Sequence, residues 1–407
     1  MGGSPDWLLG PLRAGGLGLS AGRWAGWSCF AALLVALGLY AVVLRRAAAL
    51  SPRSLLGAVA ALHALFLLAP PLLSQDVFSY LAYARMDVLE GLNPYETAPR
   101  DVPGDPVLAF AGSVDASSVY GPVFTLATGA LAPLGLPAGL WALKAVAAAA
   151  ALATVALVAL GAHDRGLDPR WAVALVGLNP AWLVHVVGGA HNEALVVLVT
   201  TAGVVLAGAS WRGARHVATR GRPAAGAALA AASVGLKASG ALVVPFLVLG
   251  ARRRAGAAFA ALAALAVVLG VGLLAVAAFG PAALDPGAVL GANQGRSSSW
   301  SFPRKLAEGL ALVAPGGWEA YLPATRTVLG AGALGCVAWL LLRTARVRIE
   351  PVRAAGWATL AVLVGTAWLV PWYVAWLLPL AALAGDRRLA WAAVALTLWT
   401  LPVAIPW

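Results

Sequence analysis

Apolar runs of about 20 residues recur along almost the whole chain, and a run of that length can cross a lipid bilayer as a helix. Inside a bilayer the backbone has no water to bond, so only helices and closed barrels span it. The pattern predicts an all-α polytopic membrane protein with about 11–13 transmembrane helices, in a single domain that covers residues 1–407. Spans are predicted at 24–44, 54–73, 138–161, 171–188, 190–208, 255–279, 322–343 and 389–404, with broken pairs of short helices at 223–250 and 354–384.

The distribution of charge supports this class. A net charge of +12 is compatible with a nucleic-acid partner, but only 11% of the residues are charged, against about 25% in soluble globular domains. Arginine clusters between spans mark the cytoplasmic side of a membrane protein. The sequence therefore predicts a plasma-membrane protein without a nucleic-acid partner, in which the long polar loops 74–137 and 280–321 face outward. Eighteen arginines lie in six short loops, at 45–53, 162–170, 209–222, 251–254, 343–353 and 385–388.

The first outer loop begins with a carboxylate at the end of an apolar run. Asp76 follows the second predicted span, and Tyr80 and Arg85 add polar groups in the next turns. A helix-end aspartate facing water is the simple interpretation. An ionisable group at the bilayer edge is nevertheless a functional candidate, and a carboxylate there can act as a general base. The apolar end of the loop, 123–136, is too short to span and is predicted to lie in the interface.

The polar triplet His191-Asn192-Glu193 separates two apolar runs and follows a Gly-Gly pair, which permits an unusual turn. The triplet is either a simple turn or part of a site. His185 lies six residues upstream, which is not the i, i+4 spacing of a helical metal pair, and no HExxH motif occurs. The sequence therefore predicts neither a metal nor a cofactor.

Lys237 is one of three lysines and lies within an apolar stretch, where an unpaired charge is costly. No acid lies near it in the sequence, so a phosphate ligand is favoured over a structural ion pair. Lys144 is close to the start of its span and is predicted to snorkel toward the interface.

The second outer loop combines cations with aromatic residues. Arg296, Arg304 and Lys305 match phosphate oxygens, and Trp300 offers a face for a sugar, although an ordinary solvated loop is an equal alternative. Tyr373 belongs to a Pro-Trp-Tyr segment between two half-length helices. It is either an interfacial belt residue or part of a cavity wall.

The combination of these motifs resembles a known family. Across about residues 50–385 the chain resembles the actinobacterial polyprenyl-phosphate-mannose-dependent α-1,6-mannosyltransferases of the GT-C superfamily of membrane glycosyltransferases. Each motif alone is short, so the resemblance depends on their order. The motifs are Ser74-Gln-Asp-Val-Phe-Ser-Tyr80, Gly91-Leu-Asn-Pro-Tyr95, Tyr120-Gly-Pro122, Asn179-Pro180, Gly188-Gly-Ala-His-Asn-Glu193, Lys237 and Pro371-Trp-Tyr373.

The resemblance implies a GT-C-like helix bundle whose long first outer loop is catalytic and contains interfacial helices. It implies an inverting transfer of mannose from a polyprenyl-phosphate-mannose donor to a lipid-anchored mannan acceptor, with an α-1,6 linkage, at an extracytoplasmic active site. Asp76 matches the base of that family. Cations alone would neutralise the leaving monophosphate, without a metal. The implied phosphate ligands are Lys237, Arg296, Arg304 and Lys305, and the implied sugar- or acceptor-binding residues are Tyr80, Arg85, Tyr120, His191, Asn192, Glu193, Trp300 and Tyr373.

The chain departs from the superfamily at Gln75, where a second acid is common. Asp87, Glu90 or Glu193 would have to supply that acid. Two other functions stay open: a GT-C transferase that uses another lipid-linked sugar, and a polytopic transporter or flippase. The two broken helix pairs suit a transporter, whereas the length of the loop 74–137 and the lack of an internal repeat favour a transferase.

Overall fold

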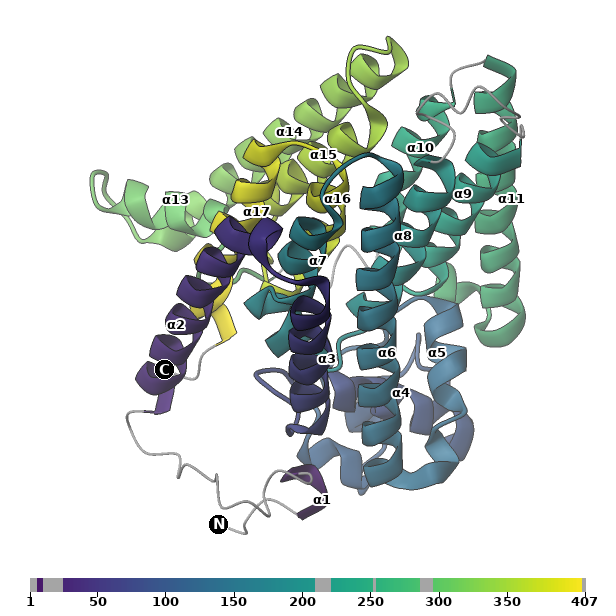
Figure 1. Ribbon diagram of the computed structural model, residues 1–407. Coiled ribbons are helices and arrows are strands. Elements are labelled where there is room, and N and C mark those ends of the chain that lie inside the picture. The colour runs from purple at the N-terminus through teal and green to yellow at the C-terminus, as the bar shows by residue number, and fades with distance from the viewer. Residues whose placement is uncertain (1–5, 10–24, 209–220, 252–253, 286–295, 405–407) are drawn as a thin grey trace.

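The computed structural model describes residues 6–9, 25–208, 221–251, 254–285 and 296–404, and every regular element in these ranges is helical (Figure 1). A π-helix, Trp182–Gly188, follows α7, and short 3-10 turns connect other helices. The predicted all-α class is therefore confirmed. The α-helices are α1 Asp6–Leu9, α2 Ala25–Arg46, α3 Pro52–Leu68, α4 Asp76–Glu90, α5 Pro122–Gly129, α6 Gly135–Asp164, α7 Pro169–Gly177, α8 Glu193–Gly208, α9 Gly221–Ala232, α10 Val244–Gly250, α11 Arg254–Phe279, α13 Phe302–Ala311, α14 Trp318–Ala345, α15 Pro351–Gly365, α16 Leu378–Leu383 and α17 Arg387–Thr400.

Several helical stretches are suited to cross a membrane, which confirms a polytopic α-helical membrane protein. Within the described ranges four stretches are long and apolar enough, or five if α7 and the π-helix, bent by 62°, form one span. Five other apolar helices have 10–17 residues. Helix length thus does not confirm the predicted count of 11–13, because proline and glycine break several apolar runs into pieces shorter than a bilayer. The four stretches are Gly26–Ala49, Pro122–Asp164, Arg254–Phe279 and Trp318–Ala345.

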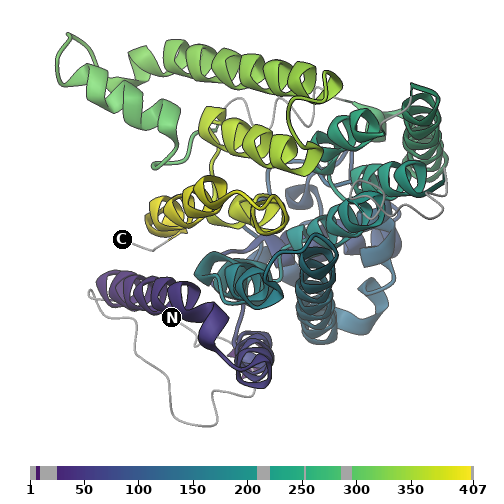
Figure 2. The ribbon, with the colours of Figure 1, turned by 45° about the horizontal axis from the view of Figure 1, so that its top comes forward.

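The outermost helices carry the apolar surface expected toward lipid. In Figure 2, α14 lies along one edge of the molecule, and Leu273 of α11 and Leu334 of α14 are 73% and 71% exposed.

Inside the bundle, α8 and α9 approach closely at two glycines. A Cβ on Gly203 would lie 2.6 Å from the carbonyl oxygen of Gly226. Small residues at such contacts are typical of helix packing in membranes.

The segment 74–137, predicted to be the first outer loop, forms α4, α5 and short 3-10 turns at one end of the helix bundle (Figure 1). Arg85 Nε contacts Asp105 Oδ2 at 2.9 Å. Tyr95 OH donates to the carbonyl of Tyr120 (2.9 Å), and Asn93 Nδ2 donates to a carbonyl at the end of α11 (2.7 Å). The apolar end of the loop forms α5 and a 3-10 turn, so two short pieces replace the single interfacial helix predicted there.

Side-chain caps begin several helices at the arginine-bearing loops. Ser51, Asp168, Glu350 and Asp386 each accept a backbone N–H from the first turn of α3, α7, α15 and α17. A proline follows the first three of these caps, where its missing N–H costs nothing. These loops are therefore tight turns, and α3 and α7 run from them toward the segments that carry Asp76 and His191.

Candidate active site

Asp76 is the first residue of α4, and the chain reaches it through a strained turn. Leu73 has a φ of 54°, in the left-handed region that non-glycine residues rarely adopt. Leu72 N donates to the Gly188 carbonyl (3.3 Å), and Asp76 N donates to Ser74 Oγ (3.2 Å). The Asp76 side chain is 29% exposed, and a helix N-terminus stabilises its charged form. The carboxylate is thus held in place and still reachable.

The His191 turn follows the π-helix and is the second strained segment of the site. A Cβ at Gly189 would lie 2.6 Å from the His185 carbonyl oxygen, so this position requires glycine. The next residue, Ala190, has a φ of 53°, and such strained residues cluster at functional sites. The turn buries His191 completely and stacks its ring on Trp372, with ring centroids 4.0 Å apart.

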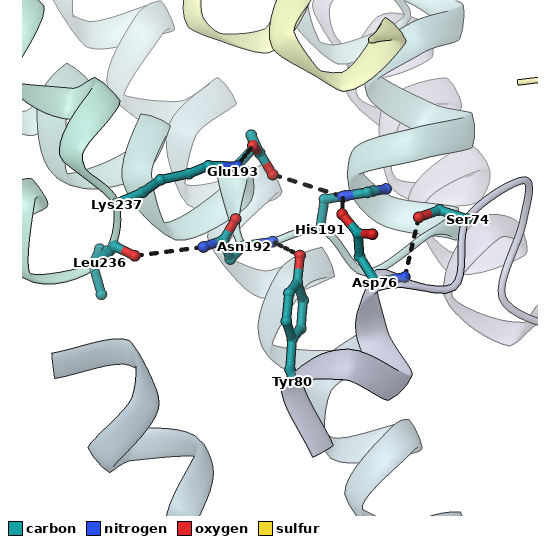
Figure 3. Close-up of polar contacts among 8 residues, drawn as sticks. All are labelled: Ser74, Asp76, Tyr80, His191, Asn192, Glu193, Leu236 and Lys237. Carbon is teal, nitrogen blue, oxygen red and sulfur yellow. Dashed lines mark hydrogen bonds and ion pairs between the residues drawn. The ribbon is translucent and has the colours of Figure 1, made fainter. Parts of the chain in front are cut away.

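Figure 3 shows that Asp76, His191, Glu193 and Lys237 form one chain of polar contacts. His191 Nδ1 lies 3.5 Å from Asp76 Oδ2 and 3.7 Å from Glu193 Oε2. Glu193 is fully buried and forms an ion pair with Lys237. A buried carboxylate needs such a partner. The imidazole is therefore placed between two carboxylates, of which one is open to substrate and the other is neutralised.

Aromatic side chains surround this chain of contacts. The Tyr80 ring packs edge-on against Tyr120, with centroids 4.8 Å apart, and Tyr80 OH accepts the backbone N–H of Asn192 (3.3 Å). Lys237 Nζ lies 5.2 Å from the ring centroid of Tyr373 and 5.8 Å from that of Tyr120. Tyrosine rings can contact sugar rings as well as cations.

The surroundings of Asp76 raise the pKa of its carboxyl toward neutral pH. Burial raises the pKa of Asp76 to about 6, with Lys237 and Arg296 acting to lower it and Glu193 acting to raise it. A base whose pKa lies just below the working pH is deprotonated yet basic enough to accept a proton. The raised pKa of Asp76 is compatible with the general-base role predicted for it.

Several buried polar atoms around the His191 turn have no hydrogen-bond partner among the described residues. They include both ring nitrogens of His185, Asn192 Oδ1, Glu193 Oε2 and Trp376 Nε1. Leaving such an atom unpaired costs about 1–3 kcal/mol, so a cluster of them requires an explanation.

The structure brings together most of the residues expected at the site. Arg296 lies apart from the polar chain, with its guanidinium 5.6 Å from the Trp368 ring centroid, but its charge reaches Asp76. The residues that meet around the His191 turn are Asp76, Tyr80, Tyr120, His191, Asn192, Glu193, Lys237 and Tyr373.

Four other expected site residues are engaged in contacts of their own. Arg85 pairs with Asp105 within the first outer loop. Arg304 and Lys305 both pair with Glu308 on α13, at 2.9 Å and 2.7 Å. The Trp300 ring lies 4.5 Å from Lys305 Nζ, and its carbonyl accepts the Trp399 indole N–H. Their roles toward a substrate stay predictions.

Two expectations about lysines need correction. For Lys237 a phosphate ligand was favoured over a structural ion pair because no acid lies near it in the sequence, but Glu193, 44 residues away, pairs with it. Lys144 does not snorkel. It is fully buried and donates to the carbonyls of Phe66 (3.1 Å) and Gly188 (2.7 Å). The end of α3 and the end of the π-helix leave these carbonyls without helical partners, so the ammonium is satisfied where it lies.

The position of a second acid and the role of Trp372 come from tertiary contacts. Of the three acids considered, Glu193 is the one that acts on the Asp76 carboxyl. Asp87 lies near the other end of α4, and Glu90 is exposed.

Trp372 was not selected from the sequence, although its place beside Tyr373 in the Pro-Trp-Tyr segment was a usable signal. Among the described residues no group of three or more His, Cys, Asp or Glu has the geometry of a metal site.

Comparisons with known proteins show which family the chain resembles. A family model described as "Alpha-(1->6)-mannopyranosyltransferase, N-terminal domain" matches residues 9–253, and one described as "MptB C-terminal domain" matches residues 306–407. No solved structure matches significantly.

Three relatives show how much of each chain is shared. Alpha-(1->6)-mannopyranosyltransferase A of Mycobacterium tuberculosis is 29% identical over 84% of this chain and 67% of its own length. The protein of the same name in Corynebacterium glutamicum is 28% identical over 44% of this chain and 35% of its own. A probable alpha-(1->6)-mannopyranosyltransferase of Mycolicibacterium smegmatis is 29% identical over 82% and 65%. This chain thus spans two thirds or less of these relatives. It belongs to the alpha-(1->6)-mannopyranosyltransferase family and is a glycosyltransferase.

Proposed function

We propose that the protein transfers mannose from a polyprenyl-phosphate-mannose donor to a lipid-anchored mannoside acceptor, forming an α-1,6 linkage on the extracytoplasmic side of the plasma membrane. The observation that carries this proposal is the Asp76 carboxylate. It is 29% exposed and lies 3.5 Å from His191, which continues the chain to the Glu193–Lys237 ion pair. Family membership favours transfer over transport, and the arginine-bearing loops support an outward-facing site.

Asp76 acts as the general base in this mechanism. Its carboxylate accepts the proton of the acceptor 6-hydroxyl while that oxygen attacks the anomeric carbon on the face opposite the phosphate. The bond from the anomeric carbon to the phosphate oxygen breaks, and the phosphate leaves with the electron pair, so the configuration inverts. Positioned base catalysis of this kind contributes about 10²–10⁴ in rate.

Arg296 is the strongest candidate to stabilise the departing phosphate. No carboxylate among the described residues lies within ion-pair distance of Arg296, and its charge reaches Asp76. Lys237 is close to the centre of the site but shares its charge with Glu193. Arg304 and Lys305 would have to exchange their shared partner, Glu308, for the phosphate. A guanidinium free of such competition offers paired donors to phosphate oxygens.

The sugar and the acceptor would bind against the aromatic wall and the His191 turn. Tyr120 and Tyr373 are half-buried beside Lys237, whereas Tyr80 is buried and holds the Asn192 backbone N–H. Asn192 Oδ1 and Glu193 Oε2 are buried acceptors without a hydrogen-bond donor. Sugar hydroxyls can donate to both acceptors, which would remove the cost of leaving them unpaired. This fit applies to hexoses in general, so an enzyme that uses another lipid-linked sugar is the alternative that a donor test must address.

The test is transfer by the purified full chain, reconstituted with polyprenyl-phosphate-mannose and a short synthetic α-mannoside, followed by linkage analysis of the product. Asp76→Asn should reduce transfer by about 10²–10⁴. Asp115→Asn is the matched control, because Asp115 lies in the same loop with a side chain that is 75% exposed. A near-native rate for Asp76→Asn would exclude the base role, and transfer from a different donor sugar alone would exclude mannose.

A further inference from the structure

A cavity of about 430 Å³ lies between the end of α2, the start of α7 and the turn from α16 to α17. It is separated from the His191 turn by the length of α7 and the π-helix, and from Asp76 by the length of α3. Its wall includes residues from three of the six arginine-bearing loops, 45–53, 162–170 and 385–388. Figure 2 shows α2 beside the C-terminal helices that close this region. The cavity therefore belongs to the end predicted to be cytoplasmic.

The two acidic residues of the cavity lining, Asp168 and Asp386, are each paired with an arginine outside the lining. Asp168 Oδ1 lies 3.3 Å from Arg170 Nε, and Asp386 Oδ2 lies 3.7 Å from Arg353 Nε. Asp386 also accepts the indole N–H of Trp357 (3.1 Å). Both acids of the lining are thus neutralised from outside the cavity.

Two arginines of the lining keep their charge available. Within the part of the chain that the structure describes, no carboxylate lies within ion-pair distance of Arg45 or Arg387, and both residues are exposed. The first-turn N–H groups of α7 and α17 are capped by Asp168 and Asp386. Guanidinium groups, and not helix termini, are therefore the groups left to hold an anion.

Aromatic and apolar groups beside these arginines indicate the kind of anion. Trp171 and Trp391 line the cavity, and the Arg45 guanidinium carbon lies 5.8 Å from the Trp391 ring centroid. Tryptophan is enriched at the level of lipid headgroups. On α2, Val42 and Leu39 precede Arg45 by three and six residues and are 48% and 63% exposed. An apolar surface fit for acyl chains thus leads to the cavity.

We propose that this cavity binds the phosphate headgroup of an anionic membrane lipid, with Arg45 and Arg387 as its ligands. Arginine forks match phosphate oxygens in geometry as well as in charge. Basic pockets between helices on the cytoplasmic side are suited to such headgroups. A free phosphate would satisfy the same guanidinium groups, but it would leave the tryptophans and the apolar face of α2 without a role. The bound lipid would hold α2, α7 and α17 together at one level.

The test measures lipid binding to the purified full chain by native mass spectrometry. The probes are dioctanoyl phosphatidylglycerol, dioctanoyl phosphatidylcholine and inorganic phosphate. We expect the phosphatidylglycerol to bind most tightly, and Arg45→Gln with Arg387→Gln to weaken it by at least about tenfold. The matched control is Arg46→Gln with Arg388→Gln, which removes the same charge from the next residues without changing the lining.

Three results would overturn the proposal: equal losses in the two double variants, equal binding of the phosphatidylcholine, and binding of inorganic phosphate as tight as that of the lipid. The last result would assign the cavity to a free phosphate compound. If the double variant is not recovered folded, Arg387→Gln alone repeats the comparison against Arg388→Gln. These two residues are neighbours in the first turn of α17, and both are exposed.

Discussion

Substitutions at the two ends of the Glu193–Lys237 ion pair should move the pH dependence of transfer in opposite directions. Burial raises the pKa of Asp76 to about 6, while Lys237 acts to lower it and Glu193 to raise it. A general base works only when deprotonated, so the native rate should rise with pH through about 6. Lys237→Met removes a cation and should move this rise to higher pH. Glu193→Gln removes an anion and should move it to lower pH.

The geometry sets the size of these shifts. Asp76 Oδ2 and Glu193 Oε2 lie 3.5 Å and 3.7 Å from the same nitrogen of His191. The two carboxylate oxygens are therefore at most about 7 Å apart. At an effective dielectric constant of about 20, charges about 7 Å apart interact by about 2 kcal/mol, which corresponds to about 1.5 pKa units. The Asp76 side chain is 29% exposed, and solvent screening reduces the interaction. We therefore expect a shift of about one pH unit for Glu193→Gln.

The assay is the initial rate of mannose transfer across the acidic to neutral range, with each variant first checked by thermal unfolding. That check is needed because removing one partner of a buried ion pair costs about 3–5 kcal/mol of stability. The double variant, Glu193→Gln with Lys237→Met, removes both charges and should return the rise toward its native pH. Shifts in the same direction for the two single variants, or no shift in either, would refute the electrostatic reasoning and the assignment of Asp76 as base.

Two further predictions concern architecture. Lys144→Met leaves the Phe66 carbonyl without its donor and the Gly188 carbonyl with only the long contact from Leu72 N, so the thermal midpoint should fall and transfer should weaken, whereas Lys305→Met should have a much smaller effect on unfolding. Unchanged unfolding of Lys144→Met would contradict the structural role given to this lysine. In a chain without its two native cysteines, a cysteine at Asp115 should react with an impermeant thiol reagent from outside intact cells, and one at Val347, which is 80% exposed, should not. The reverse labelling pattern would place the site on the cytoplasmic side.

Hydropathy, together with the positions of proline, glycine and charged residues, was enough to predict the class of this protein and to select the polar residues that meet around the His191 turn. The apolar runs predicted helices at nearly the positions found, and the break at Lys237 and the Pro-Trp-Tyr segment before Tyr373 were both recognised as interruptions. The polar residues Asp76 and His191 were selected because each interrupts an apolar environment. Such features depend on residues that are close in the sequence. They can be predicted from it because exposing backbone groups or charges to lipid is costly.

Ion pairs and helix ends could not be derived in the same way. Glu193 pairs with Lys237 across 44 residues, and Arg85 with Asp105 across 20, so their partners depend on how distant segments pack. The carbonyls that satisfy Lys144 exist because two helices end beside it. Span number stays a prediction for a related reason, since mean hydropathy does not record where a helix breaks. Electrostatic energy depends on separation in space, and local composition does not specify that separation.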